Sequence, residues 1–572
     1  MCGISGIVGT KATEVNIEKM TALLKHRGQD HVGHEVQAGR FALGHNRLSI
    51  IDLNRSADQP FKSNNGKYSL VFNGEIYNYL EIRKELEKGQ VKFNTSSDTE
   101  VLLQAYKHWG ENCLERFNGM FAFAIYDYDK DSLFMARDRF GVKPLYYAFS
   151  GDDLVFASEI KALQQFVKAK INKKVLANYL AYGSYGMPDE TFFENIYQLP
   201  GGYKAEYQNG KFYSSQWYDF VEITQRSIDK NKNITWDEAK HRYKTLLEES
   251  IQLRFRADVP VGFNLSGGVD SSLLLALVNQ RKDAGNIQAF TFYTGDDRYD
   301  ELYWVEQMVH LTKTTLNKVK FTHFDFKEWH QHISYIQDEP YGGLPTLAYA
   351  KLFQSAADKG IKVLLDGQGM DEAWAGYDYY QNDSQQTIQG QKKNVSPFKT
   401  DCLQPELQHR FKKPEYPKPY DSELLNKQYR DLFYTKIPRA LRFNDRISMA
   451  ATTELREPFL DHRLVEFAFS LPKEFKIRNG EGKYMLRQIL NDYNAGEIAF
   501  APKRPLQTPQ REWLASELSE VVAKAMHKLE SDGDKFLKTE IIEKYWRDYK
   551  NGEQSTSFHI WQWMSAQKLM EQ

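Results

Sequence analysis

The sequence predicts an α+β region with antiparallel strands up to about residue 217 and an α/β region with a parallel sheet from about residue 237. Three observations support this division. Short segments of period-two alternation fill the first part, strand-like and helical segments alternate in the second, and the polar stretch 218–236 separates them. A chain of 572 residues is also too long for one hydrophobic core. We therefore expect domains at 2–217 and 237–572, joined by a linker at 218–236.

Local patterns predict the elements of the first region. The charged turn Asp129–Asp131 lies between two apolar runs, which is typical of a hairpin, so the strands beside it should pair antiparallel. Helical spacing predicts one helix that ends near Gly28 and another that ends near Gly110. Strands covered by a few helices indicate a layered α+β domain. The predicted strands are Tyr68–Phe72, Met120–Tyr126 and Ser132–Ala136.

The second region alternates strands with helices, which implies βαβ crossovers and a parallel sheet. In such sheets ligands bind beyond the carboxyl ends of the strands. The segment 377–438 is rich in Gln, Lys and Pro and weakly periodic, and we expect it to be a long insertion whose order the pattern does not fix. The predicted helices are Glu238–Phe255, one from Ser271, one from Glu301 and one around Tyr349–Ala357, and the predicted strands are Val259–Leu265, Gln288–Tyr293, Val319–Phe324 and Ile361–Leu365.

Composition excludes several classes of protein. The 75 Lys plus Arg balance 76 Asp plus Glu, so no field of one sign is available to hold a nucleic acid. Three cysteines without a CxxC pair disfavour a disulfide scaffold and a thiolate zinc site. No apolar stretch approaches the ~18–20 residues that cross a bilayer, and the start lacks the layout of a secretory signal. We expect a cytoplasmic protein that binds neither nucleic acid nor membrane.

Cys2 carries the most chemical information in the first region. Removal of the initiator methionine would leave a thiol and a free α-amine on one residue. That amine has a pKa of about 7.7–8.0, so part of it is unprotonated at neutral pH and can accept the thiol proton. The alternative is that Cys2 is a small apolar residue at the start of a strand.

Four more residues stand in suggestive strings. Arg47 lies in HNRLSI, Asn73 with Glu75 in FNGEIYN, and Asp98 in SSDTEVLL. Each also has an ordinary interpretation. The arginine can be a surface charge, Asn-Gly a hairpin turn, and the aspartate a first-turn acid in a Ser-x-x-Glu capping box.

Together these strings resemble the glutaminase domain of class II, N-terminal-nucleophile glutamine amidotransferases, over residues 2–217. ARDRFGVKPLYY and FASEIKAL are similar to its asparagine-synthetase branch. The resemblance implies an αββα sandwich, the Ntn-hydrolase fold. It implies that Cys2 attacks the glutamine carboxamide and that Asn73 and the Gly74 N–H form the oxyanion hole. The implied glutamine-binding residues are Arg47 for the α-carboxylate and Glu75 and Asp98 for the ammonium.

In the second region, FNLSGGVDSSLLLALV places a Gly-Gly turn between a strand and a helix. Glycine lets the backbone approach an anion, and the helix N-terminus directs N–H groups at it, so a phosphate is expected there. No G-K-S or G-K-T occurs, which excludes a Walker A loop. The string resembles the pyrophosphate loop of ATP pyrophosphatases, which implies cleavage of ATP to AMP and pyrophosphate. The implied ATP-binding residues are Leu265, Ser266, Gly267, Gly268, Asp270, Ser271, Asp366 and Gly367.

Asp371 in LLDGQGMDEAWAGY is a second acidic position after a strand. If both strands belong to the parallel sheet, Asp270 and Asp371 lie at its carboxyl edge and can share Mg²⁺ with the phosphates. A solvated loop acid is the alternative for Asp371. HExxH is absent, and His330 and His332 have no further ligands in sequence, so we expect them to be structural.

NDRISMAATTELREPFLDHRLVEFAFSLP and GKYMLRQIL resemble the synthetase domain of glutamine-dependent asparagine synthetases. The resemblance implies that Lys483 stabilises charge on an acyl-adenylate. Arg446 and Glu457 lie in matching strings without an assigned role. Synthetases that act on aspartate usually have an acidic residue where this chain has Gln368, and often serine where it has Asp366.

The predicted function is transfer of ammonia from glutamine, through an interior passage between the domains, to a carboxylate activated as acyl-AMP. Aspartate is the favoured acceptor. The departures at Gln368 and Asp366 leave another carboxylate open, such as a uronic acid of a surface polysaccharide. A non-catalytic regulator that binds nucleotide and glutamine is a further alternative. Class II amidotransferases that feed sugar phosphates or 2-oxoglutarate are disfavoured, because they would lack SGGVDSS. The oligomeric state is left open, with a homodimer as one option.

Overall fold

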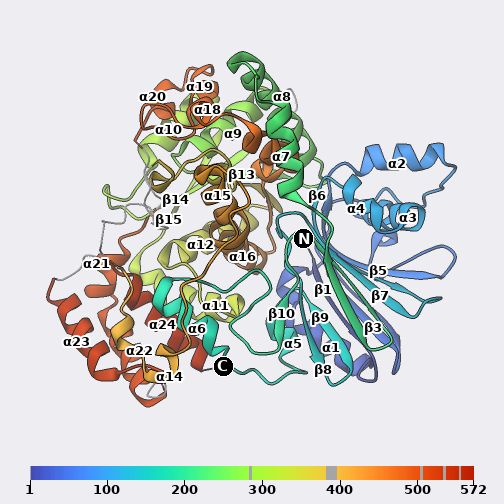
Figure 1. Ribbon diagram of the computed structural model, residues 1–572, viewed down its shortest axis with the longest axis horizontal. Helices are drawn as coiled ribbons and strands as arrows, with labels where there is room; N and C mark the ends of the chain where they lie inside the picture. The colour runs from blue at the N-terminus through green and yellow to red at the C-terminus, as the bar shows by residue number, and fades with distance from the viewer. Residues whose placement is uncertain are drawn as a thin grey trace.

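The computed structural model describes residues 2–281, 287–381, 396–502, 507–532, 536–552 and 556–571. Two antiparallel sheets formed by the N-terminal part stand beside a C-terminal part built around a parallel sheet (Figure 1). Among the described residues, none of the helices combines the length and apolar character needed to span a bilayer. The fold class predicted from the sequence is confirmed.

The N-terminal part is a four-layer sandwich. Its two sheets have the orders β10-β8-β9-β1-β3-β2 and β12-β11-β7-β6-β5-β4, and every pair is antiparallel. Leu43 and Val71 point between the sheets, whereas their neighbours Ala42 and Phe72 pack under the outer helices, as period-two alternation requires. The strands are β1 Gly3–Val8, β2 His31–Gln37, β3 Phe41–Arg47, β4 Phe61–Lys62, β5 Tyr68–Ile76, β6 Gly119–Asp127, β7 Ser132–Arg137, β8 Tyr146–Ser150, β9 Asp153–Ala157, β10 Ile196–Gln198, β11 Tyr203–Gln208 and β12 Lys211–Gln216.

Helices cover both outer faces of this sandwich, which gives the αββα order that the resemblance implies. The expected hairpin joins β6 to β7, with Asp131 at φ +52°. The first predicted helix is followed by a 3₁₀ turn, Lys25–Arg27, that ends at Gly28, and the second is capped by Gly110. The covering helices are α1 Glu14–Leu23 and α5 Ile160–Leu163 on one face, and α2 Tyr79–Lys88, α3 Asp98–Trp109 and α4 Cys113–Arg116 on the other.

The polar segment 218–236 contains a helix, α7 Phe220–Lys230, where we expected a linker. Asp219 caps it by accepting a hydrogen bond from the Glu222 N–H at 2.9 Å. Phe220 is buried and packs edge-on against Phe469, with ring centroids 4.8 Å apart. The polar composition belongs to the exposed face of an amphipathic helix, which is why the segment resembles a linker in sequence.

The C-terminal sheet has the order β15-β14-β13-β16-β17 and is entirely parallel. Its strands are β13 Val261–Asn264, β14 Gln288–Tyr293, β15 Thr315–Lys320, β16 Val363–Leu365 and β17 Glu454–Arg456, and the main helices beside it are α8 Trp236–Arg254, α9 Val269–Asn279, α10 Leu302–Thr312 and α12 Leu344–Asp358.

One strand prediction in this sheet was wrong in its bounds, and one strand was not predicted at all. The predicted strand Val319–Phe324 overlaps only the end of β15. This strand lies at the edge of the sheet and many of its residues are polar, so it lacks the apolar pattern from which strands are predicted. β17 was missed because its apolar content is low: Glu454 and Arg456 are buried as charged groups.

The segment 377–438 is more regular than expected at its end. Residues 382–395 lie outside the described part of the chain. Helix α15 Glu423–Arg430 continues through a π-helical turn, Asp431–Thr435, into α16 Lys436–Ala450. Asp431 accepts hydrogen bonds from the hydroxyls of Tyr379 and Tyr380 at 2.8 Å each, which ties this helix to the start of the segment.

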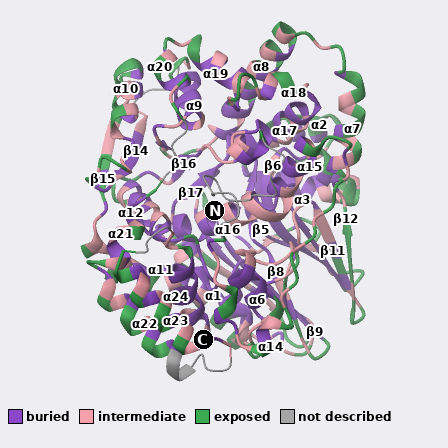
Figure 2. Ribbon diagram, turned by 60° about the vertical axis from the view of Figure 1, so that its left-hand side comes forward, coloured by how far each residue is buried: buried purple, intermediate pink, exposed green. Residues whose placement is uncertain are grey.

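A buried group of charges joins the two parts of the molecule. Arg27 Nη1 lies 2.8 Å from Glu159 Oε1 and 2.8 Å from Asp445 Oδ2, and Arg446 Nη1 lies 2.9 Å from the same Glu159 oxygen. Lys161 contacts Glu159 as well. Burial alone would raise the pKa of Glu159, but Arg446, His26 and Lys161 hold it well below its usual value. Buried residues continue from the sandwich through α16 to the parallel sheet (Figure 2).

The substitution Glu159→Gln should destabilise the protein by about 3–5 kcal/mol, because it leaves buried cations without their shared carboxylate. We expect the melting temperature to fall by several degrees in calorimetry. Asp129→Asn, which breaks the exposed pair with Lys67, is the matched control and should leave the melting temperature unchanged. Equal melting temperatures for the two variants would contradict this interpretation.

Candidate active sites

Cys2 directly precedes strand β1 of the sandwich and is nearly inaccessible to solvent. Its N–H donates to Asn73 Oδ1 at 3.0 Å, and its carbonyl accepts from Arg27 Nε at 3.1 Å. Its Sγ is 3.9 Å from the Leu48 carbonyl oxygen. Burial raises the pKa of the Cys2 thiol, so the thiolate needs a proton acceptor close by. Met1 lies outside the described residues.

Asn73 and Gly74 follow one another in β5, beside Cys2. Within the described part of the chain, Asn73 Nδ2 is buried and has no hydrogen-bond partner. A buried donor without a partner is costly unless a ligand accepts from it. Gly74 has φ +151°, and a Cβ there would lie 2.1 Å from the Met120 carbonyl oxygen. Only glycine fits that position, so the geometry is compatible with the expected pair of donors.

The three expected glutamine-binding side chains surround the same region, with different partners. Arg47 donates to Asp58 Oδ1 at 2.7 Å and to the Asn54 carbonyl at 2.8 Å, so its guanidinium is already positioned. Asp98 starts α3 and accepts from the Ile76 N–H at 3.0 Å, and burial raises the pKa of Asp98 to about 6. Burial also raises the pKa of Glu75 well above its usual value.

The second site is a cavity of about 320 Å³ at the carboxyl edge of the parallel sheet. The Ser266–Gly268 turn lies between β13 and α9, and Gly268 caps α9, so the helix N-terminus opens into the cavity. Ser271 Oγ donates to the Ser266 carbonyl at 2.6 Å and tightens the turn. Leu265 is buried and does not line this cavity. The predicted residues that do line it are Ser266, Gly267, Gly268, Asp270, Ser271, Asp366, Gly367, Asp371 and Lys483.

Lys483 brings the two acidic positions together. Its Nζ lies 2.5 Å from Asp270 Oδ1 and 2.6 Å from Asp371 Oδ1. Burial opposes its charge, but the two carboxylates raise the pKa of Lys483 above its usual value. Its backbone is left-handed, φ +58°, and its N–H donates to the Trp374 carbonyl at 2.9 Å, which directs the side chain into the cavity. Two carboxylates beside a phosphate-binding turn also form a donor set that suits Mg²⁺.

The loop that follows β16 carries further carboxyl groups. Burial raises the pKa of Asp366 to about 6 and that of Glu372 to about 7. Asn264 Nδ2 donates to Asp366 Oδ1 at 3.3 Å, whereas Oδ2 has no hydrogen-bond partner among the described residues. Gln368 stands between these acids and lines the cavity.

The two sites meet at β17. Arg456 Nη2 lies 3.4 Å from Glu75 Oε1 of the first site. The carbonyl of the same arginine accepts from the Asp366 N–H, 3.0 Å away, at the start of the loop of the second site. One residue therefore contacts both sites.

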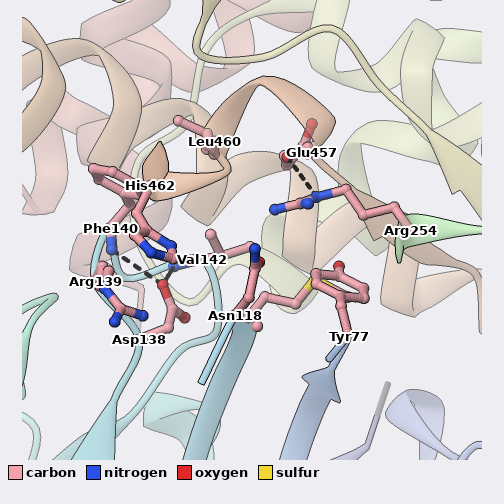
Figure 3. Close-up of a pocket in the computed structure, with 12 residues that line it drawn as sticks. Tyr77, Asn118, Asp138, Arg139, Phe140, Val142, Arg254, Glu457, Leu460 and His462 are labelled. Carbon is pink, nitrogen blue, oxygen red and sulfur yellow. Dashed lines mark hydrogen bonds between the residues drawn. The ribbon is translucent and has the colours of Figure 1, made fainter. Parts of the chain in front are cut away.

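A cavity of about 10 Å³, enough for about one water-sized molecule, lies between the two parts of the chain. Figure 3 shows Tyr77, Asn118 and Asp138 on one side of it and Arg254, Glu457 and His462 on the other. Arg254 Nε donates to the Glu457 carbonyl at 3.1 Å. The packing between the two parts of the chain therefore leaves a small gap at this point.

Sequence reasoning missed several residues at these sites. The cavity of about 320 Å³ is also lined by Tyr349, Trp304 and Arg487, and Arg456 links it to the first site. The spacing of Lys483 and Arg487, four residues apart, could have indicated Arg487, because such residues share a helix face. The others come from segments that have no nearby motif.

Comparison with known proteins agrees with this arrangement. A model of the glutamine amidotransferase domain matches residues 1–218, and a model of the asparagine synthase family matches residues 242–571. Asparagine synthetase [glutamine-hydrolyzing] 1 of Bacillus subtilis is 28% identical over 98% of this chain and 95% of its own length. Asparagine synthetase [glutamine-hydrolyzing] 3 of the same organism is 29% identical over 88% of this chain and 86% of its own length. Amidase chyE of Penicillium rubens is 27% identical over 90% of this chain and 89% of its own length.

The two family models together cover both parts of the chain. The chain belongs to the glutamine-hydrolysing asparagine synthetase family, as a glutamine-dependent amidotransferase joined to an asparagine synthase-like ligase domain.

Proposed function

We propose that this enzyme hydrolyses glutamine at Cys2 and uses the ammonia to amidate a carboxylate activated as acyl-AMP. The observation that carries the proposal is the contact of Arg456 with both Glu75 and the Asp366 loop. An ammonia-producing site and an adenylating site that share one strand can exchange a small molecule without releasing it to water, where it would be protonated.

In the first half-reaction, the α-amine of processed Cys2 accepts the thiol proton and the sulfur attacks the carboxamide carbon. Asn73 Nδ2 and the Gly74 N–H donate to the developing oxyanion, each contributing about 3 kcal/mol. The proton moves to the leaving nitrogen, ammonia departs, and water hydrolyses the thioester to glutamate. Arg47 and Asp98 hold the α-carboxylate and ammonium of glutamine.

In the second half-reaction, the turn at Ser266–Gly268 binds the phosphates of ATP. Asp270 and Asp371 would hold Mg²⁺, which supplies positive charge to the phosphates. The acceptor carboxylate attacks the α-phosphorus and pyrophosphate leaves. Ammonia then attacks the acyl carbon, AMP leaves, and the amide forms. Lys483 balances negative charge in both steps.

Two acceptors follow from the residues. The likeness to asparagine synthetases favours aspartate. Gln368 and Asp366 favour another carboxylate, because a carboxamide at 368 does not accept a proton at neutral pH. A regulator without catalysis would release no pyrophosphate with any acid. Pyrophosphate release with ATP, Mg²⁺, glutamine and a candidate acid therefore tests the proposal.

Cys2→Ala should abolish the glutamine-dependent reaction and retain the reaction with added ammonium, because only the nucleophile is lost. The measurement is pyrophosphate release with each nitrogen source, on protein whose intact mass shows that Met1 has been removed. Cys113→Ala, a buried thiol in the same domain, is the control and should retain both. Loss of both activities in Cys2→Ala would show that its role is structural.

The KM for glutamine should rise as the pH falls below about 6, because protonation of Asp98 removes the negative charge that attracts the substrate ammonium. Above that pH the carboxylate is ionised and the KM should be constant. Asp98→Asn should show a high KM without this pH dependence. Glutaminase kinetics from pH 5 to 8 check the prediction, and the same pH profile in both proteins would refute it.

Lys483→Met should lower kcat for pyrophosphate release by about 10²–10³, the range seen when one charge-stabilising group is removed. Glutamine hydrolysis at the distant thiol should persist. Lys473→Met, an exposed lysine at the start of α18 Lys473–Lys476, is the control. An unchanged kcat in Lys483→Met would remove the lysine from the mechanism.

A further inference from the structure

A second, much larger cavity opens next to the adenylating site. Its volume is about 1910 Å³, against about 320 Å³ for the cavity at the phosphate-binding turn. Tyr349 of α12 and Gln368 of the loop after β16 line both, so the two spaces adjoin at these residues. Pockets for small ligands usually measure about 300–1,000 Å³. The larger space far exceeds what an amino acid such as aspartate would fill.

The walls of this cavity come from both parts of the chain. Residues 183–188 follow α6 Lys173–Tyr182 of the sandwich, and Trp561 and Gln562 belong to α24 Phe558–Met570. The segment 377–438, for which the sequence indicated no role, supplies Phe398, Lys413 and Tyr416. The insertion therefore shapes this space.

Helix α16 carries positive charge on the cavity wall. Lys436, Arg439 and Arg442 are spaced three residues apart and all line the cavity. Arg442 pairs with Glu339 at 2.5 Å, but in the described part of the chain no ion pair or hydrogen bond connects Lys436 or Arg439 to an acid. Among the described lining residues, cationic side chains outnumber acidic ones. An anionic ligand would compensate this charge.

Burial, together with the charge of Arg439, lowers the pKa of Lys436 to about 7. Asp431 and Glu372 act in the opposite direction, and Arg430 adds to the positive field. An anion bound beside the helix would favour the charged form of the lysine.

Aromatic rings accompany these cations. Tyr185 stacks under Arg442, 5.2 Å from its guanidinium carbon to the ring centroid, and Arg439 lies 5.8 Å from the same ring. Tyr416 and Trp561 line the same space, as do residues with hydroxyl and amide groups such as Thr346 and Gln510. Aromatic rings together with hydrogen-bonding groups suit a hydroxylated, ring-shaped ligand.

Building on the amidation reaction above, we propose that the acceptor is a sugar acid carried on a phosphate or diphosphate. Its ring carboxylate reaches the adenylating site past Gln368, and its phosphate lies against Lys436, Arg439 and Arg442. Size, charge and the aromatic lining all favour this class over free aspartate, which is small against the cavity and has neither a ring nor a phosphate.

The test measures pyrophosphate release with ATP, Mg²⁺ and ammonium for four acids: L-aspartate, glucuronate, UDP-glucuronate and UDP-galacturonate. UDP-glucose, which lacks the carboxylate, is the blank. We expect kcat/KM for a UDP-uronate to exceed that for L-aspartate by at least tenfold, with the amide product detected by mass spectrometry. Free glucuronate should have a higher KM, because it lacks the phosphates.

Arg439→Ala should raise the KM for the UDP-uronate by about tenfold or more, the effect of losing one charged contact, without changing the KM for ATP. Arg439→Lys should lose less. Arg226→Ala, an exposed arginine of α7, is the matched control and should leave both KM values unchanged.

Preference for L-aspartate would overturn the acceptor assignment and leave the amidation reaction standing. Pyrophosphate release with none of the acids would overturn the amidation reaction itself. An unchanged acceptor KM in Arg439→Ala would remove α16 from phosphate binding.

Discussion

The shared carboxylate of Glu159 is the interaction on which the arrangement of the two parts depends. It accepts from Arg27 of the sandwich and from Arg446 of α16, and Asp445 completes the cluster. Buried ions bring a large desolvation cost, and only a geometry that pairs all of them recovers it. That requirement restricts α16 to one rotation about its axis. The start of the helix then carries the cations of the large cavity, and its later turns carry the joining charges Asp445 and Arg446.

Strand β17 extends the same constraint to the catalytic sites. Glu454 and Arg456 are fully buried, and Arg456 packs beside Tyr77 while it contacts Glu75. Burial alone would lower the pKa of Arg456, but Glu454 and Glu75 keep its guanidinium firmly protonated. The charge pairing at β17 thus reaches Glu75, which we expect to bind glutamine, and the backbone of the loop that starts at Asp366.

Local patterns predicted much of the fold, because the β6–β7 hairpin and the strand–turn–helix at Ser266 are encoded by neighbouring residues. They failed where long-range packing decides the outcome. β17 is a strand of paired charges, and α7 is a helix whose buried side is a few residues such as Phe220. At the sites, the geometry of a parallel sheet predicted Asp270 and Asp371 at one edge, and resemblance added Lys483. The structure places both carboxylates in contact with the lysine. The large cavity was not foreseeable, because its walls come from segments that are distant in sequence.

The shortness of β17 has a consequence for how this protein tolerates change along its chain. In a strand, successive side chains face opposite sides, so a shift of one position exchanges the faces. A single residue inserted between α16 and β17 would turn Leu455 toward the sandwich and aim both charged neighbours into apolar surroundings. Length variation among natural or engineered sequences should therefore be scarce in this connection, although surface hairpins such as the one at Asp131 can absorb extra residues.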